Sequence, residues 1–172
     1  MKINILRIIL IMLLIGTFYI IFGFSSQDGE QSASVSRQIT ENITKDIKSI
    51  QKLEKSKKEI VLGKIEYIIR KIAHFSLYTI VGFLLMSLMS TYNLKKIRRI
   101  QISCSIGLIY AISDEIHQSF TPERSPQIGD VIIDFCGVFF GIGISIIVLK
   151  IYEKIKKKFS ACTWYLNISV IK

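Results

Sequence analysis

The sequence predicts an all-α fold, a polytopic membrane protein built as a four-transmembrane-helix bundle, and two observations carry this prediction. Half of the 172 residues are apolar and the mean hydropathy is +0.43, which is too apolar for an ordinary soluble domain. The apolar residues also fall into four blocks that reach or approach the roughly 20 residues needed to cross a bilayer. We therefore expect a single membrane domain over residues 1–172.

The expected transmembrane helices cover residues 8–24, 70–92, 98–118 and 130–149. The first is expected to be a retained helix rather than a cleaved signal peptide, because bulky residues precede its exit at Ser25. The third has an apolar run, residues 100–113, that covers only about 21 Å. A helix that crosses the hydrocarbon layer of about 30 Å must therefore include Asp114 and Glu115. Ionisable groups at that depth indicate a functional site.

The positive charges predict the orientation in the membrane. Lys and Arg residues cluster near the N-terminus, in the short turn Lys95-Lys96-Ile97-Arg98-Arg99 and in the tail, so we expect both termini in the cytoplasm. Residues 25–69 would then form an outer loop and residues 150–172 a cytoplasmic tail. The net charge of +10 fits attraction to anionic lipid better than a nucleic-acid surface. Membrane lipids are therefore expected partners, and nucleic acid is not.

Apolar residues recur at steps of three and four within the expected outer loop, at Ile39, Ile43, Ile47, Ile50 and Leu53. This spacing predicts an amphipathic helix between the first two spans, over about residues 34–63, that lies on the outer membrane surface or across the mouth of the bundle. In residues 54–59 the apolar residues no longer recur at these steps, so a solvated helix that only connects two spans is an equal alternative there.

Polar side chains gather near the outer end of each of the last three spans. They are Arg70, Lys71, His74 and Tyr78 on the second span, Asp114, Glu115, His117 and Gln118 on the third, Arg124 in the next turn, and Asp130 and Asp134 on the fourth. Because an unpaired charge in hydrocarbon is costly, the simplest arrangement is one inward-facing ion network. Asp114 and Glu115 are about 100° apart on a helix, so they cannot point in the same direction.

The chain resembles the VanZ-like family of membrane proteins over roughly residues 18–147. The residues that carry the resemblance are Phe24-Ser25-Ser26-Gln27, Arg70-Lys71-Ile72-Ala73-His74-Phe75, Tyr78, Gly82, Asp114-Glu115-Ile116-His117-Gln118-Ser119-Phe120, Pro122, Arg124, Asp130, Asp134, Gly137 and Gly141. Two positions depart from the family pattern, since Glu123 replaces a common Gly and Asp134 a frequent Asn.

The resemblance implies an integral protein of the bacterial cell envelope, in a family whose namesake is associated with teicoplanin resistance. It also implies a role in lowering susceptibility to lipoglycopeptide antibiotics by binding or altering an outer-leaflet lipid or a cell-wall component. A lipid-linked cell-wall precursor or the lipoglycopeptide itself would then be the partner.

The residues leave three roles open for the polar groups. In the first, the site is a binding pocket that opens outward, and Arg70, Lys71 and Arg124 hold a phosphate or carboxylate in it. The other residues predicted for binding are His74, Tyr78, Asp114, Glu115, Gln118, Asp130 and Asp134. In the second, the protein is an acid/base or metal-dependent enzyme acting on an envelope lipid, with candidate catalytic residues His74, Asp114, Glu115 and His117. In the third, the network is purely structural and fixes helix packing beside Gly137 and Gly141.

The distribution of polar groups favours binding among these roles. Proton-coupled transport would need polar groups through the whole depth of the membrane. The expected inner halves of the spans have few such groups. The His, Asp and Glu residues have no compact spacing of the kind that metal sites show, so neither a metal nor another cofactor is predicted. The sequence leaves the oligomeric state open.

Overall fold

The computed structural model describes residues 2–122, 124 and 126–169, with side chains from residue 4 to residue 158 within those ranges. This described part of the chain confirms the all-α prediction, because it forms six helices and no strand. The helices are α1 Lys2–Ser25, α2 Gly29–Thr44, α3 Lys48–Gln51, α4 Lys55–Ser90, α5 Lys96–Gln118 and α6 Ile128–Ser169.

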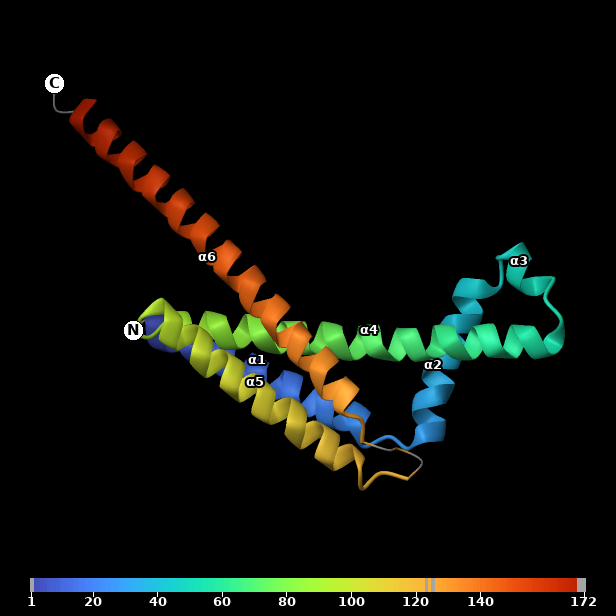
Figure 1. The fold of residues 1–172 in the computed structure, drawn as a ribbon. Coiled ribbons are helices and arrows are strands. Elements are labelled where there is room, and N and C mark those ends of the chain that lie inside the picture. Colours follow the sequence, from blue (N-terminus) through green and yellow to red (C-terminus); the bar gives the residue numbers. More distant parts are fainter. Residues whose placement is uncertain (1, 123, 125, 170–172) are drawn as a thin grey trace.

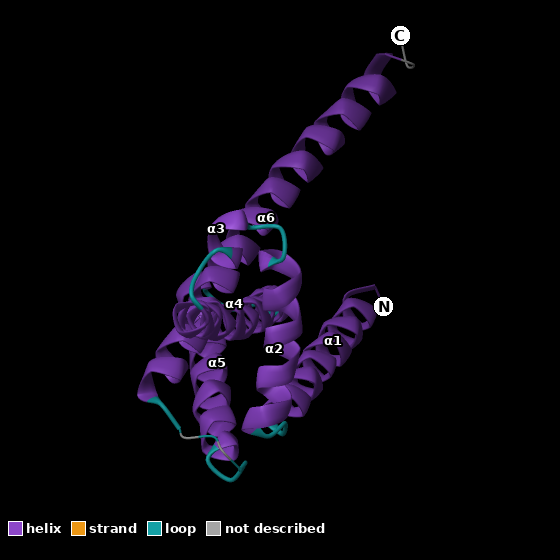
Figure 2. Cartoon of the chain, turned by 90° about the vertical axis from the view of Figure 1, so that its right-hand side faces the viewer, coloured by secondary structure: helices purple, strands orange, loops and turns teal. Residues whose placement is uncertain are grey.

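Helix α4 is the axis of the molecule, and each of the other helices contacts it. In Figure 1, α1 and α5 run beside the C-terminal half of α4, α6 crosses α4, and α2 lies against the N-terminal half. Figure 2 looks nearly along α4 and shows the other long helices grouped around it. The ends of α1 and α5 and the start of α6 therefore meet near the middle of α4.

Within the part of the chain whose side chains are described, three helices are long and apolar enough to cross a membrane, over Asn4–Ser25, Lys55–Ser90 and Ile128–Lys158. Helix α5, the third of the four spans expected from the sequence, is not among them. It has 23 residues, but basic residues at its start and Asp114 and Glu115 near its end leave a short apolar middle. Helix α4 has 36 residues and extends about 54 Å, so its N-terminal part reaches beyond a hydrocarbon layer of about 30 Å.

Helix α1 exposes much of its apolar surface. Leu10, Leu14 and Ile21 face the bundle and are buried, whereas the side chains of Met12 and Ile15 point outward and are 68% and 61% exposed. A continuous apolar surface of this kind is costly in water but suits a helix that faces lipid. Arg7 fastens the start of α1 to the end of α4 by donating hydrogen bonds to Thr91 Oγ1 at 3.0 Å and to the Thr91 carbonyl at 2.6 Å.

Helices α4 and α6 pack with their backbones in contact because glycines line the crossing. A Cβ atom added to Gly82 of α4 would overlap the Val138 carbonyl of α6, and one added to Gly141 of α6 would overlap the Thr79 carbonyl of α4. Gly137 meets the Phe75 carbonyl in the same way. Helices thus pack closely beside Gly137 and Gly141, where the sequence indicated helix packing, and this lets α6 cross α4 closely enough to bring their polar side chains together.

The segment between α1 and α4 differs from the single amphipathic helix expected over about residues 34–63. Asp28 caps the start of α2 by accepting a hydrogen bond from the Gln31 amide at 2.7 Å, and α2 ends at Thr44. The one-turn helix α3 follows, and residues 55–63 belong to α4. The chain must turn back here because α2 packs against α4 through Ser36, Thr40 and Thr44, which one continuous helix could not do.

Candidate functional site

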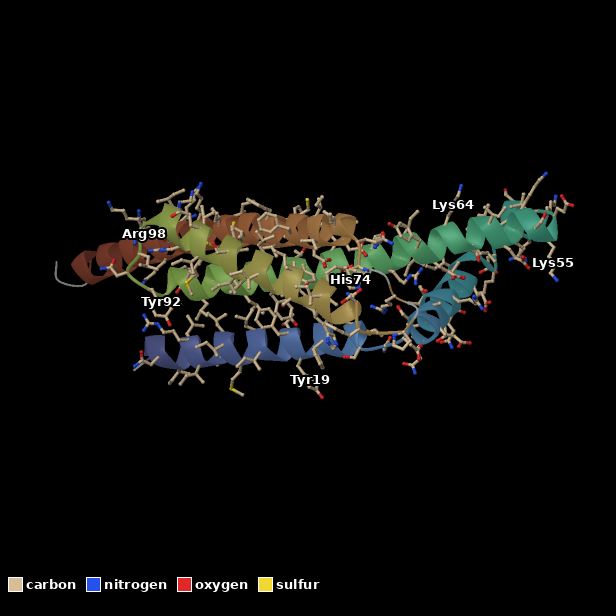
Figure 3. The ribbon with its side chains drawn as sticks, turned by 60° about the horizontal axis from the view of Figure 1, so that its bottom comes forward. Tyr19, Lys55, Lys64, His74, Tyr92 and Arg98 are labelled. Atoms are coloured by element: carbon tan, nitrogen blue, oxygen red, sulfur yellow. The ribbon has the colours of Figure 1, made fainter. Side chains whose placement is uncertain are left out.

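The residues predicted for binding lie where α1 and α5 end and α6 begins, beside the middle of α4. In Figure 3, His74 marks this level, with Tyr92 and Arg98 at one end of the molecule and Lys55 and Lys64 at the other. We call this region the polar junction. It comprises Arg70, Lys71, His74, Tyr78, Asp114, Glu115, Gln118, Arg124, Asp130 and Asp134.

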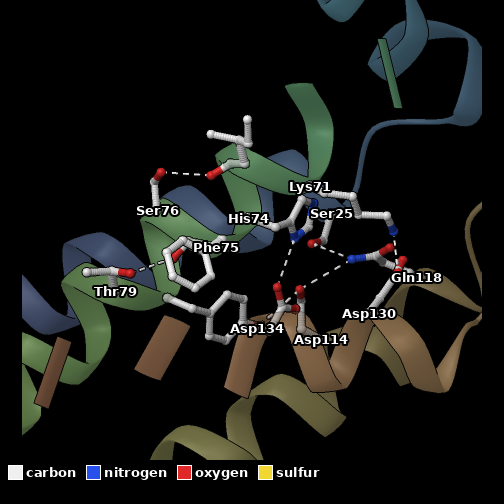
Figure 4. A network of polar contacts seen from close by, with 12 residues as sticks. Ser25, Lys71, His74, Phe75, Ser76, Thr79, Asp114, Gln118, Asp130 and Asp134 are labelled. Carbon is white, nitrogen blue, oxygen red and sulfur yellow. Dashed lines mark hydrogen bonds and ion pairs between the residues drawn. The ribbon is translucent and has the colours of Figure 1, made fainter. Parts of the chain in front are cut away.

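Asp114 is the centre of the hydrogen bonds in the polar junction. Tyr78 Oη donates to Asp114 Oδ2 at 3.2 Å, and Gln118 Nε2 donates to the same oxygen at 3.3 Å. Gln118 Nε2 also donates to Ser25 Oγ at 3.2 Å, which ties the end of α1 to α5 (Figure 4). All four side chains are buried, so these bonds are shielded from competing water. Ser25 was not predicted as a site residue, although it is one of the residues that carry the family resemblance.

His74 and Asp134 face each other across α4 and α6 beside this hydrogen-bonded group. His74 Nδ1 lies 3.7 Å from Asp134 Oδ1, a separation too long for a hydrogen bond. Asp134 is only 1% exposed, and its Oδ1 has no hydrogen-bond partner among the described residues. His74, Asp114 and Asp134 each offer a ligand atom within 4.8 Å of the other two. The sequence did not predict this cluster, because its members come from three helices and lie far apart in the chain.

A second acidic residue of α6, Asp130, pairs with the positive charge of Lys71. The Lys71 ammonium forms an ion pair with Asp130 Oδ1, and it also lies 4.9 Å from the centre of the Tyr67 ring. Both side chains of the ion pair are about one-fifth exposed. Among the described residues, this is the only Lys–acid or Arg–acid ion pair in the polar junction.

Glu115 and His117 point to different neighbours. Glu115 Oε1 accepts a hydrogen bond from the Gln127 amide at 2.7 Å and so holds the turn before α6, while its buried Oε2 has no partner among the described residues. His117 turns toward α1, where its ring stacks on Phe22 at 4.5 Å and its Nε2 lies 3.1 Å from Ser26 Oγ. The structure therefore does not bring His117 together with Asp114, although both were predicted as candidate catalytic residues.

Arg70 and Arg124 add positive charge without an acidic partner among the described residues. Arg124 Nη2 donates to the Phe24 carbonyl at 3.3 Å. Burial, together with the nearby positive charge of Arg70, lowers the pKa of the Arg124 guanidinium, although nearby acids oppose the shift. The pKa of arginine is high enough that Arg124 stays charged. The guanidinium groups of Arg70 and Arg124 thus place two positive charges in one partly buried region.

These side chains line two adjacent cavities. The more polar one has a volume of about 200 Å³ and is lined by Ser32, Tyr67, Arg70, Lys71, His74, Gln118, Arg124, Gln127 and Asp130. The more apolar one has a volume of about 110 Å³ and is lined by Phe24, Gln27, Ser32, Val35, Ser36, Ile39, Ile69, Arg70, Ala73, His74, Leu77 and Arg124. The two cavities share Ser32, Arg70, His74 and Arg124. A ligand with an anionic end and an apolar end would find matching surroundings in the pair.

A family model described as VanZ/LLP1 matches residues 10–149. Comparisons with curated proteins and with solved structures found no match. The matched residues include most of α1, all of α4 and α5 and the first part of α6, and thus part or all of every helix that contributes to the polar junction. The match covers most of the chain and agrees with the resemblance seen in its polar residues, and the chain belongs to the VanZ/LLP1 family of VanZ-like membrane proteins.

Proposed function

We propose that the protein is a multi-pass protein of the bacterial cell membrane, with α5 as a fourth span, both termini in the cytoplasm and the polar junction at the outer leaflet. The length of α5, about 35 Å for 23 residues, supports this arrangement because it exceeds the hydrocarbon thickness. The basic residues Lys96, Arg98 and Arg99 at its start would then lie on the cytoplasmic side. Asp114 and Glu115 would lie near the outer interface.

In this orientation, the polar junction binds an anionic group from outer-leaflet lipid or from a lipid-linked cell-wall precursor. The observation that carries the proposal is the cavity of about 200 Å³ that Arg70, Lys71 and Arg124 line together. Lys71 is already paired with Asp130, so the two guanidinium groups supply the positive charge available to a ligand. Arginine offers paired donors that match phosphate and carboxylate oxygens.

The adjacent apolar cavity supports a lipid as the source of the anionic group. Phe24 at the end of α1, Ile39 of α2 and Leu77 of α4 line this cavity, and Arg70 and Arg124 stand between it and the polar cavity. A phosphate held by the arginines would thus have apolar surroundings for the start of its hydrocarbon chain. By holding or shielding such a component, the protein lowers the susceptibility of the cell to lipoglycopeptide antibiotics.

Binding is tested by native mass spectrometry of the purified full-length protein with phosphatidylglycerol, a polyprenyl phosphate and phosphatidylcholine as probes. We expect the first two to bind more tightly than the zwitterionic lipid. Arg124→Ala should weaken binding of the anionic probes about tenfold or more, equivalent to about 1.4 kcal/mol. The matched control is Arg98→Ala, which removes an exposed arginine at the opposite end of the molecule. Equal binding by wild type and Arg124→Ala would contradict the proposal.

The effect on antibiotic susceptibility is measured in cells that express the same variants at equal levels in the membrane. Wild type and Arg98→Ala should raise the inhibitory concentration of teicoplanin, and Arg124→Ala should not. If a correctly inserted Arg124→Ala protects as well as wild type, protection does not depend on the anion site.

A further inference from the structure

The cluster of His74, Asp114 and Asp134 has the composition and the spacing of a metal site. Each residue comes from a different helix, namely α4, α5 and α6, and each offers one ligand atom within 4.8 Å of the others (Figure 4). The 3.7 Å between His74 Nδ1 and Asp134 Oδ1 matches two ligands bound about 2.1 Å from one ion at roughly 120°. Small side-chain movements would bring all three atoms to one ion.

The two carboxylates of the cluster are not balanced by the cations around them. Asp134 is 1% exposed and Asp114 is 4% exposed, and among the described residues neither forms an ion pair with a lysine or an arginine. The groups that donate to Asp114, Tyr78 Oη and Gln118 Nε2, are neutral. Asp134 Oδ1 is buried without a hydrogen-bond partner and faces the His74 ring. Two buried carboxylates with this little compensation are costly unless a cation or protons neutralise them.

We propose that His74, Asp114 and Asp134 bind a divalent first-row metal ion, of the Zn²⁺ or Mn²⁺ class. Its two positive charges would balance the two carboxylates and give Asp134 Oδ1 the partner that the protein does not supply. One imidazole nitrogen with two carboxylate oxygens is a donor set that suits these ions, and three protein ligands leave a coordination position open.

The surroundings of the cluster support a metal ion in two ways. Tyr78 and Gln118 both donate hydrogen bonds to Asp114 Oδ2, which orients the carboxylate. The other oxygen, Asp114 Oδ1, takes no part in these two bonds. Hydrogen bonds of this kind orient carboxylate ligands in metal sites. His74 also lines both cavities of the polar junction, so an ion has a route to the cluster from the cavity that Arg70 and Arg124 line.

The metal site does not rest on the proposed anion binding, because metal content is measured without any added lipid. Full-length protein in detergent is stripped with EDTA, dialysed against Zn²⁺ or Mn²⁺ alone, and analysed for bound metal by mass spectrometry of the element. We expect about one ion per chain and a higher melting temperature with the metal than without it.

The variants His74→Gln and Asp134→Asn keep the size of each side chain but change a ligand. Both should bind the metal at least about tenfold more weakly and lose the metal-dependent rise in melting temperature. His117→Gln is the matched control, because His117 stacks on Phe22 away from the cluster, and Asp46→Asn is an exposed acid control. Both controls should bind metal as wild type does.

Two results would overturn the metal site. If the stripped wild-type protein binds neither Zn²⁺ nor Mn²⁺, the carboxylates are neutralised by protons instead. This result is obtained with the wild-type protein alone, so it does not depend on whether a variant folds. If His74→Gln and Asp134→Asn bind metal as tightly as wild type, the ion lies elsewhere in the protein.

Discussion

Three polar residues near the end of α5 contact three different parts of the protein. Asp114 faces Tyr78 and α4, Glu115 holds the turn before α6, and His117 stacks against Phe22 of α1. Successive residues of a helix point about 100° apart, so the sequence could predict that Asp114 and Glu115 diverge. Which neighbour each one meets depends on where α1, α4 and α6 pack, and a single sequence does not contain that information.

The hydrogen bond from Tyr78 to Asp114 should contribute measurably to stability. Among the described residues, Tyr78 Oη is the one hydroxyl that donates to this buried carboxylate, so Tyr78→Phe should lower the free energy of unfolding by about 1–3 kcal/mol. Tyr67→Phe is the control, since Tyr67 is 47% exposed and the change keeps the ring beside Lys71. Unfolding in mixed detergent measures both variants. Equal loss of stability in the two would show that the bond contributes nothing specific.

The described residues form only part of the ion network that the sequence predicted. Lys71 pairs with Asp130, as an inward-facing ion network requires, but Arg70 and Arg124 do not pair with acids among the described residues. The cluster of His74 and two aspartates was missed because compact spacing along the chain is a poor guide when ligands come from different helices. Burial, which leaves Asp134 Oδ1 without a partner, can only be seen in the folded protein.

At the scale of elements, the contact between α4 and α6 positions the site. Asp130 and Asp134 reach Lys71 and His74 only because the glycines below them let the two helices approach closely. The sequence indicated helix packing beside Gly137 and Gly141, but not which helix packs there. The break between α2 and α4 was not predicted, because periodicity within residues 34–63 does not reveal that Ser36, Thr40 and Thr44 pack back against α4.

Gly141→Ala should weaken the crossing of α4 and α6. Its Cβ would overlap backbone atoms of Thr79 and Phe83, so the helices must move apart, at a cost of about 1–3 kcal/mol and with a lower melting temperature. Gly143→Ala is the matched control two residues away, because a Cβ there meets nothing within 4 Å. A thermal unfolding series in detergent compares the two. Similar melting temperatures would mean that α4 and α6 are not held by this contact.

At the scale of the whole molecule, polarity is asymmetric along the bundle axis. Arg7, Arg98 and Arg99 lie at one end, and the polar junction lies where the other ends of α1 and α5 meet α6. The N-terminal part of α4 and helix α2 extend beyond that junction. Hydropathy alone could predict the apolar helices, but α5 is too charged at its ends for length and composition to identify it as a span. Its role as a fourth span is part of the proposal above, which is supported by the helix length of about 35 Å and by the basic residues at its start.

The polar junction is expected to face the outside of the cell, and sided labelling of single cysteines measures this orientation. In a background with Cys104, Cys136 and Cys162 changed to Ser, Lys57→Cys lies beyond the junction and Asn93→Cys lies in the turn at the opposite end. Both positions are exposed. We expect a membrane-impermeant maleimide to label Lys57→Cys in intact cells and Asn93→Cys only after permeabilisation. Labelling of Asn93→Cys in intact cells, with Lys57→Cys protected, would contradict this orientation.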